Sequence, residues 1–185
     1  MDAFSEALAV VPVIHMPVTP GQQVLLLGPG AGAAADIVLR YPTTTAVLVV
    51  GDTVTTKDRR VQTMSSLDQV PLGWADLSVV VIPVLTPAIV QAVYARRRAP
   101  AGIAVFALAN PTQVKATRDL VKTIWTVVQP YREHTENGPA WFLLAGDHGF
   151  RRHRPVPGWT GRLTEKYLPA LFTLAKDEYA GAFGG

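Results

Sequence analysis

Short apolar runs alternate along this chain with segments whose apolar residues recur at helical spacing. The runs are rich in valine, leucine and isoleucine, and glycine, proline or polar residues bound them, as is typical of β-strands. The run at 77–82 is apolar except for Ser78, which favours a strand covered on both faces of a sheet. We expect strands at residues 23–27, 45–50, 58–64 (the weakest), 77–82 and 102–109.

Segments with a helical pattern follow most of these runs. The first is rich in alanine and is stopped by Pro42. Another ends in three arginines, which the negative C-terminal end of a helix dipole favours, and a third begins with Pro111, which suits a first helical turn. We expect helices at residues 31–41, 87–98, 111–128 and 162–181.

The pattern changes after the fifth strand. Residues 127–133 and 140–147 are β-type runs on either side of the turn-rich link HTENGP, and we expect them to pair antiparallel. The order predicts an α/β fold with a doubly wound, Rossmann-like sheet that is mostly parallel and carries an antiparallel C-terminal hairpin. No repeat or internal boundary interrupts it, so we expect a single domain over residues 1–185.

Composition narrows the classes of function. Of the 185 residues, 49% are hydrophobic and 17% charged, which predicts a globular domain with a substantial core. The absence of cysteine excludes disulfides, thiolate metal sites and a thiol nucleophile. The net charge of +3 does not require an acidic partner, and we expect no nucleic-acid partner.

Two hydrophobic stretches could be mistaken for targeting or membrane segments. Residues 77–93 are interrupted by Pro83 and Pro87, so they predict a strand, a loop and a helix start rather than a membrane span. The first residues include Asp2 and Glu6 without a basic region, unlike a secretory signal. We expect a soluble, cytoplasmic protein with no membrane partner.

A glycine turn joins the first strand to the first of these helices. Gly28, Gly30 and Gly32 fit a G-x-G-x-G pattern, in which glycine permits a sharp turn and close approach of a ligand to the backbone. Asp52 lies at the carboxyl end of the next strand, just after residue 50, where a carboxylate can accept hydrogen bonds from ribose hydroxyls. The spacing is closer to the nucleoside turn of S-adenosylmethionine-dependent transferases than to G-x-G-x-x-G. A tight turn without a ligand fits the same residues.

Other polar groups suggest no catalytic or metal centre. The basic and aromatic segment 150–159 has the composition of a solvated loop, although it could also contact phosphates. The histidines lack the spacing of metal ligands, so we expect no metal. They are His15, His134, His148 and His153.

Several segments resemble, in the same order, those of the spermidine synthases, a family of polyamine aminopropyltransferases. The resemblance covers nearly the whole chain and depends on the order of weak motifs. The segments are DAFSEALAVVPVIHMPVTPGQQVLLLGPGAG, AVLVVGD, DRRVQ, ADLSVVVIPVLTP, AGIAVFALANP, WFLLAGD and LTEKYLPALFTLAKD.

The resemblance implies a class I methyltransferase-like fold and a nucleoside ligand at the glycine turn. S-adenosylmethionine, its decarboxylated form and methylthioadenosine are the implied cofactors. Gly28, Gly30, Gly32 and Asp52 would hold the nucleoside, and Asp68, near the family's G-D-A carboxylate, would reach the adenine amino group.

The chain departs from the family at its acidic positions. The aspartate of G-G-G-D-G is Ala31, the ribose-binding glutamate is Val50, and the D-S-T-D-P loop reads IPVLTP over residues 82–87, without either catalytic aspartate. We also expect the family's N-terminal β domain to be absent, because the chain begins at the helix that follows it. The catalytic residues therefore stay unknown.

These departures predict a pseudoenzyme that has lost aminopropyl transfer. It would serve as a binding, regulatory or structural interaction module that self-associates or contacts another protein and is still able to bind a nucleoside. The alternative is an active S-adenosylmethionine-dependent transferase, either a methyltransferase or an aminopropyltransferase.

Overall fold

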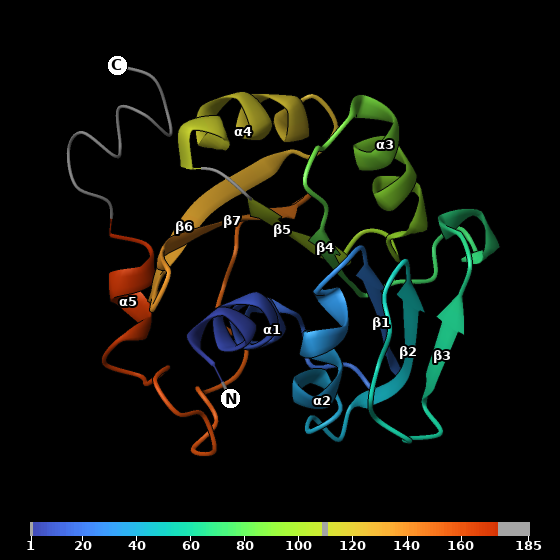
Figure 1. Cartoon of the computed structure of the whole chain (residues 1–185), viewed down its shortest axis with the longest axis horizontal. Helices are drawn as coiled ribbons and strands as arrows, with labels where there is room; N and C mark the ends of the chain where they lie inside the picture. The colour runs from blue at the N-terminus through green and yellow to red at the C-terminus, as the bar shows by residue number, and fades with distance from the viewer. Residues whose placement is uncertain (1, 109–110, 174–185) are drawn as a thin grey trace.

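A mixed β-sheet forms the centre of the computed structural model, which describes residues 2–108 and 111–173 (Figure 1). The strand order in the described residues is β3-β2-β1-β4-β5-β7-β6. β1 to β5 pair in parallel, and β7 lies antiparallel between β5 and β6. This confirms the predicted α/β fold with its antiparallel C-terminal hairpin. The strands are β1 Gln22–Leu27, β2 Thr44–Val50, β3 Val61–Met64, β4 Leu77–Val81, β5 Ile103–Leu108, β6 Val127–Thr135 and β7 Gly138–Gly146.

Helices cover both faces of the sheet. One layer holds α1, α2 and α5, and the other holds α3 and α4 (Figure 1). Within residues 2–108 and 111–173, no helix combines the length and hydropathy needed to cross a membrane. The helices are α1 Ala3–His15, α2 Ala35–Val38, α3 Pro87–Arg96, α4 Val114–Lys122 and α5 Leu168–Leu171, with 3₁₀ turns η1 Ala31–Ala34, η2 Leu67–Gln69 and η3 Pro111–Gln113.

The two layers give two cores, one on each face. Along β1, Val24 and Leu26 belong to the core under α1 and α2, whereas Leu25 and Leu27 belong to the core under α3 and α4. All four side chains are buried. Burial on both faces explains why the central strands are continuous apolar runs rather than alternating ones.

Helix α1 is almost entirely buried and is bonded to distant parts of the chain. Asp2 caps its N-terminus by accepting a hydrogen bond from the Ser5 N–H at 2.8 Å. The buried Glu6 carboxylate accepts three backbone N–H groups, those of Gly161, Arg162 and Leu163, at 2.6, 3.1 and 3.0 Å. The C-terminal segment is thereby held against the first helix.

Several predicted elements are shorter than expected. The helix predicted at 31–41 begins as a 3₁₀ turn and contains one α-helical turn, because the chain enters it from Gly30 in the left-handed conformation. The helix predicted at 111–128 ends at Lys122, since the chain must turn and start β6 at Val127. The helix predicted at 162–181 is limited to α5 in the described residues, and its part beyond 173 lies outside them.

The C-terminal hairpin is longer than predicted. Thr135 pairs with Gly138, so the strands continue through most of the HTENGP link and only Glu136 and Asn137 form the turn. Gly138, with φ +103°, supplies the left-handed backbone next to that turn.

Candidate functional site

The glycine turn lies at the carboxyl ends of the parallel strands. It follows β1, whose two neighbours are β2 and β4. The chain continues from β1 to β2 on one side and reaches β4 on the other side only after β3, so this is the point where the strand order reverses. Ligands of doubly wound sheets bind at such a switch point.

Gly28 is required by packing within the chain itself. Its φ is +92°, and a Cβ atom built on it would lie 2.2 Å from the Val81 carbonyl oxygen. The backbone after β1 therefore touches the backbone at the end of β4. Only glycine combines this conformation with this contact.

Asp52 is bonded to the glycine turn. Its Oδ2 accepts hydrogen bonds from the N–H groups of Gly30 and Gly32 at 2.9 and 2.8 Å. Its Oδ1 accepts the Thr53 N–H at 2.8 Å. The structure thus brings together the three predicted glycines and Asp52, and it directs this carboxylate at the turn's own N–H groups.

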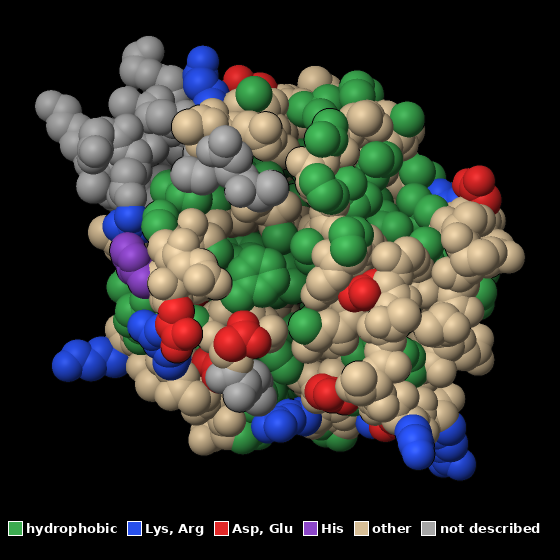
Figure 2. Space-filling view, viewed as in Figure 1, with side chains coloured by type: hydrophobic (Ala, Val, Ile, Leu, Met, Phe, Trp, Pro, Cys, Tyr) green, Lys and Arg blue, Asp and Glu red, His purple; other side chains and the backbone are tan. Residues whose placement is uncertain are grey.

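The end of β4 borders the same turn and is apolar. A cavity of about 160 Å³ opens there, lined by Val81, Ile82 and Pro83. Figure 2 shows hydrophobic side chains gathered on this face, over the connection from β4 to α3. The remaining lining residues come from α1, the turn and the end of β5: Phe4, Pro29, Ala107 and Leu108.

No family model and no curated protein matches this chain. Among solved structures, spermidine synthase from Thermotoga maritima superimposes with a TM-score of 0.80 at 16% identity, covering 97% of this chain and 73% of that one. A spermidine synthase in complex with the transition-state analogue AdoDATO gives a TM-score of 0.79, with the same identity and coverage.

Human methyltransferase-like protein 13, in complex with SAH, gives a TM-score of 0.61 at 13% identity over 98% of this chain and 91% of that one. These superpositions and the strand order decide the fold. The chain has a class I methyltransferase-like fold. The likeness to spermidine synthases is structural, at low sequence identity.

Two residues stand where the spermidine synthases carry acidic side chains near the turn, and both are buried in the cores of this fold. Val50, the last residue of β2, is 4% exposed and belongs to the core under α3 and α4. Ala31, at the start of η1, is fully buried in the opposite core. Neither position offers a polar group at the turn.

Among the described residues, Asp68 does not belong to the hydrogen-bond network of the glycine turn. It sits on η2 after β3, its side chain is 96% exposed, and its Oδ1 lies 3.5 Å from Nη2 of Arg96. The Arg96 guanidinium is held mainly by the carbonyl oxygens of Leu67 and Ala92. In the described residues Asp68 makes no hydrogen bond to the glycine turn or to Asp52, and its role in adenine recognition stays a prediction.

A second cavity, of about 570 Å³, adjoins the apolar one and shares Phe4 and Leu108 with it. It carries the carboxylates of Asp2 and Glu136 together with Arg162. In Figure 2, acidic side chains are visible below the apolar centre of this face. Among the described residues, no group of three or more histidines and carboxylates could hold a metal ion.

The sequence did not single out Asp2 or Glu136 as site residues. Burial alone would raise the pKa of Asp2, but hydrogen bonds from the Ser5 N–H and hydroxyl outweigh it, and the pKa is lowered. Asp2 has a recognisable helix-cap position, whereas nothing local marks Glu136. It lines this cavity because the β6–β7 hairpin places its turn beside the start of α1.

Proposed function

We propose that the chain is a noncatalytic, spermidine-synthase-like protein that has lost aminopropyl transfer and works as an interaction module. The observation that carries this proposal is the end of β4, where Val81, Ile82 and Pro83 line the cavity beside the glycine turn. A transferase acting on amines needs a group there that attracts the ammonium form and removes a proton.

The chemistry of these side chains argues against an amine substrate. Desolvating an ammonium group against Ile82 and Val81 has no compensating hydrogen bond. A missing general base alone costs a factor of about 10²–10⁴ in rate. Asp52, the nearest carboxylate of the turn, is already bonded to three backbone N–H groups.

Nucleoside binding is the part of the ancestral site that we propose is retained. The apolar surface between Pro29 and Pro83 suits a flat base or a thioether. S-adenosylmethionine, its decarboxylated form and methylthioadenosine are the ligands to try, at Gly28, Gly30, Gly32 and Asp52, with Asp68 as a further contact.

The test combines an activity assay with calorimetry. Purified protein is incubated with putrescine and decarboxylated S-adenosylmethionine, with an authentic spermidine synthase as the positive control. We expect neither spermidine nor methylthioadenosine above the blank. Spermidine formed in proportion to protein concentration would contradict the proposal.

Calorimetric titration with the three nucleosides tests the retained binding. We expect heat with at least one of them and its loss in Pro83→Arg, which places a long cation at the cavity. Leu72→Arg is the matched control, because Leu72 is 73% exposed and does not line the cavity. Absence of heat with all three ligands would remove the nucleoside from the proposal and leave the interaction module.

Methyl transfer is the second candidate, and the same apolar cavity favours it. The sulfonium of S-adenosylmethionine is already activated, so positioning an acceptor can supply much of the catalysis without an acidic base. An apolar or planar acceptor would pack on Ile82 and Leu108. Transfer of a labelled methyl group to a panel of phenols and indoles, with SAH formed in equal amount, would favour this function over the first.

A further inference from the structure

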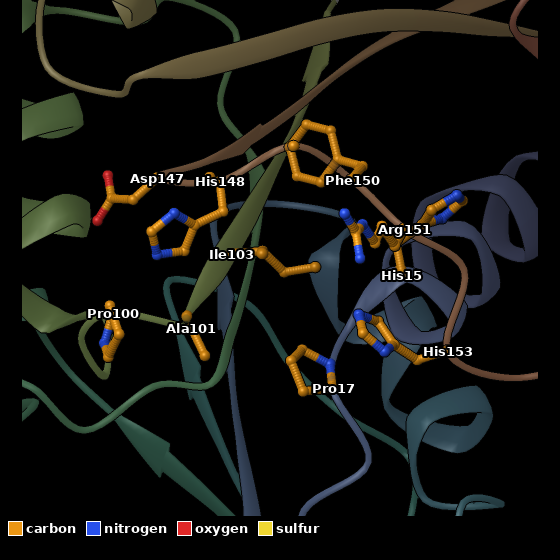
Figure 3. Close-up of a pocket in the computed structure, with 13 residues that line it drawn as sticks. His15, Pro17, Pro100, Ala101, Ile103, Asp147, His148, Phe150, Arg151 and His153 are labelled. Atoms are coloured by element: carbon orange, nitrogen blue, oxygen red, sulfur yellow. The ribbon is translucent and has the colours of Figure 1, made fainter.

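A third cavity lies at the opposite end of the strands from the glycine turn. It has a volume of about 380 Å³ and opens where β5 begins and β7 ends (Figure 3). Its walls come from the end of α1, the link before β5 and the segment 147–153 that follows β7. We call it the β5-start pocket. The proposed function does not use it, and its residues Phe150, Arg151 and His153 belong to the basic and aromatic segment 150–159.

The floor of the β5-start pocket is apolar. Ile103 is 6% exposed and lies at the start of β5, and Pro17 follows α1. Phe150 packs against the end of β7, since a Cβ atom built on Gly146 would lie 3.0 Å from its Cε1. Such a floor accepts a flat or aliphatic group.

The rim carries an arginine and two histidines. In Figure 3, the Arg151 guanidinium and the His153 ring lie on one side of Ile103, and the His148 ring lies on the other. Within the part of the chain that the structure describes, these three side chains have no hydrogen-bond or ion-pair partner.

The carboxylate among the described residues that line the pocket, Asp147, forms an ion pair with Arg97. Asp147 Oδ2 accepts a hydrogen bond from Arg97 Nε at 2.9 Å and lies 2.5 Å from Nη2 of the same guanidinium in an ion pair. That guanidinium also lies over the Tyr94 ring, 3.7 Å from its centroid. Figure 3 shows the Asp147 carboxylate pointing away from Ile103. The pocket therefore keeps an excess of positive charge.

The segment that carries Arg151 and the two histidines is anchored at its far end. The N–H of His153 donates to the Ile14 carbonyl oxygen at 2.8 Å. The next side chain, Arg154, donates to Thr43 Oγ1 at 3.0 Å and to Gln22 Oε1 at 2.7 Å. Anchoring reduces the ordering cost of binding, because the backbone next to the cations is already in place.

We propose that the β5-start pocket binds a small amphiphilic anion: a carboxylate or phosphate monoester on a flat apolar body. The apolar body packs on Ile103 and Phe150, and the anionic oxygens accept hydrogen bonds from Arg151 and the neighbouring histidines. The volume lies in the usual range for small-molecule sites. This inference is independent of the proposed function, which concerns the other edge of the sheet.

Calorimetric titration of the full chain tests the pocket with four probes: phenyl phosphate, benzoate, inorganic phosphate and phenol. We expect phenyl phosphate or benzoate to bind at least about tenfold more tightly than inorganic phosphate or phenol. Only these two probes combine a ring that packs on the apolar floor with an anionic group that accepts hydrogen bonds from the rim. Comparing the first two distinguishes a phosphate from a carboxylate ligand.

Matched variants locate the binding. Arg151→Ala should weaken the tighter probe about tenfold, since a charge-assisted hydrogen bond is lost. Arg59→Ala, an exposed arginine on the β2–β3 loop, should leave it unchanged. His148→Ala should likewise weaken the tighter probe. His134→Ala is its control, because His134 lies on the β6–β7 hairpin, and it should leave binding unchanged.

Circular dichroism of each variant shows that it is folded before it is titrated. Binding that is equal in Arg151→Ala and Arg59→Ala would overturn the proposal. So would the absence of heat with all four probes. Either result would leave Arg151, His148 and His153 as solvated surface side chains without a ligand.

Discussion

Single residues at the glycine turn serve the chain's own packing. Gly28 makes room for the Val81 carbonyl, and Asp52 accepts the N–H groups of Gly30 and Gly32. In a nucleotide-binding turn, such N–H groups are available to a ligand. Here Asp52 accepts the N–H groups of Gly30 and Gly32, so these two groups have partners without a ligand.

Gly28→Ala should lower the free energy of unfolding by about 3 kcal/mol or more, because the new Cβ would clash with backbone and the φ of +92° would be strained. Gly158→Ala is the control, since nothing lies within 4 Å of its added Cβ. It should stay within about 0.5 kcal/mol of the parent protein. Urea denaturation measures both, and equal effects would refute the close contact.

His15 gives stability a dependence on pH. Burial lowers its pKa below the ordinary value of 6.5, despite the hydrogen bond from its ring to the Val11 carbonyl. As pH falls through 6.5, the unfolded chain binds a proton that the folded chain takes up only at lower pH, so folding stability decreases.

His15→Asn keeps a donor for the Val11 carbonyl and removes the titration. Between pH 7.5 and pH 5, the range in which histidine titrates, its free energy of unfolding should fall less than that of the parent protein. Urea denaturation at the two pH values measures this. An identical fall in both proteins would show that His15 does not contribute.

At the scale of elements, α1 is bound to the C-terminal segment through one buried carboxylate. Glu6 and Gly161 are 155 positions apart in the chain, yet their hydrogen bond is 2.6 Å long. Tyr131 of β6 adds a second connection by donating its hydroxyl to the Ala7 carbonyl at 2.9 Å. These bonds fix α1 beside the two cavities at the carboxyl edge.

Glu6→Gln should lower the free energy of unfolding by about 2–3 kcal/mol, because the amide cannot accept on both sides and leaves a backbone N–H without its partner. Glu136→Gln, on the exposed hairpin turn, is the matched control and should change it by less than about 0.5 kcal/mol. Thermal or urea unfolding checks the pair. A neutral Glu6→Gln would mean that α1 is held by packing alone.

At the scale of the whole molecule, both faces of the sheet are covered, and the carboxyl edge keeps an exposed apolar surface. Val84 is 68% exposed on the β4–α3 connection and borders a groove of about 220 Å³ with Leu85 and Leu120. Apolar surface of this kind is typical of contact sites. We propose that a second copy of the chain covers it, in line with the interaction module.

Light scattering coupled to size exclusion should detect a concentration-dependent dimer. Val84→Glu places a charge on the proposed contact and should shift the dissociation constant at least about tenfold toward monomer. Val18→Glu is the control, because Val18 is similarly exposed, at 57%, and does not line the groove. A parent protein that stays monomeric at all concentrations would contradict self-association.

The local pattern of the chain was enough to predict its architecture. The central strands are mostly apolar runs, and the hairpin follows from two β-type runs on either side of a turn, so neighbouring residues carry the information. The absence of carboxylates after β4 can also be read directly from residues 82–87. Helix lengths were overestimated, because helical spacing does not show where the chain must turn into the next strand.

The amino-acid sequence by itself determined the order of strands and helices, the glycine turn and the apolar end of β4, since each depends on residues close together in the chain. Only the tertiary structure decided that Asp52 faces the turn, that Glu6 holds residues 161–163, and that Arg151 and Ile103 share a pocket. These contacts join residues 20 to 157 positions apart. Packing of the whole fold brings them together, and no local pattern records it.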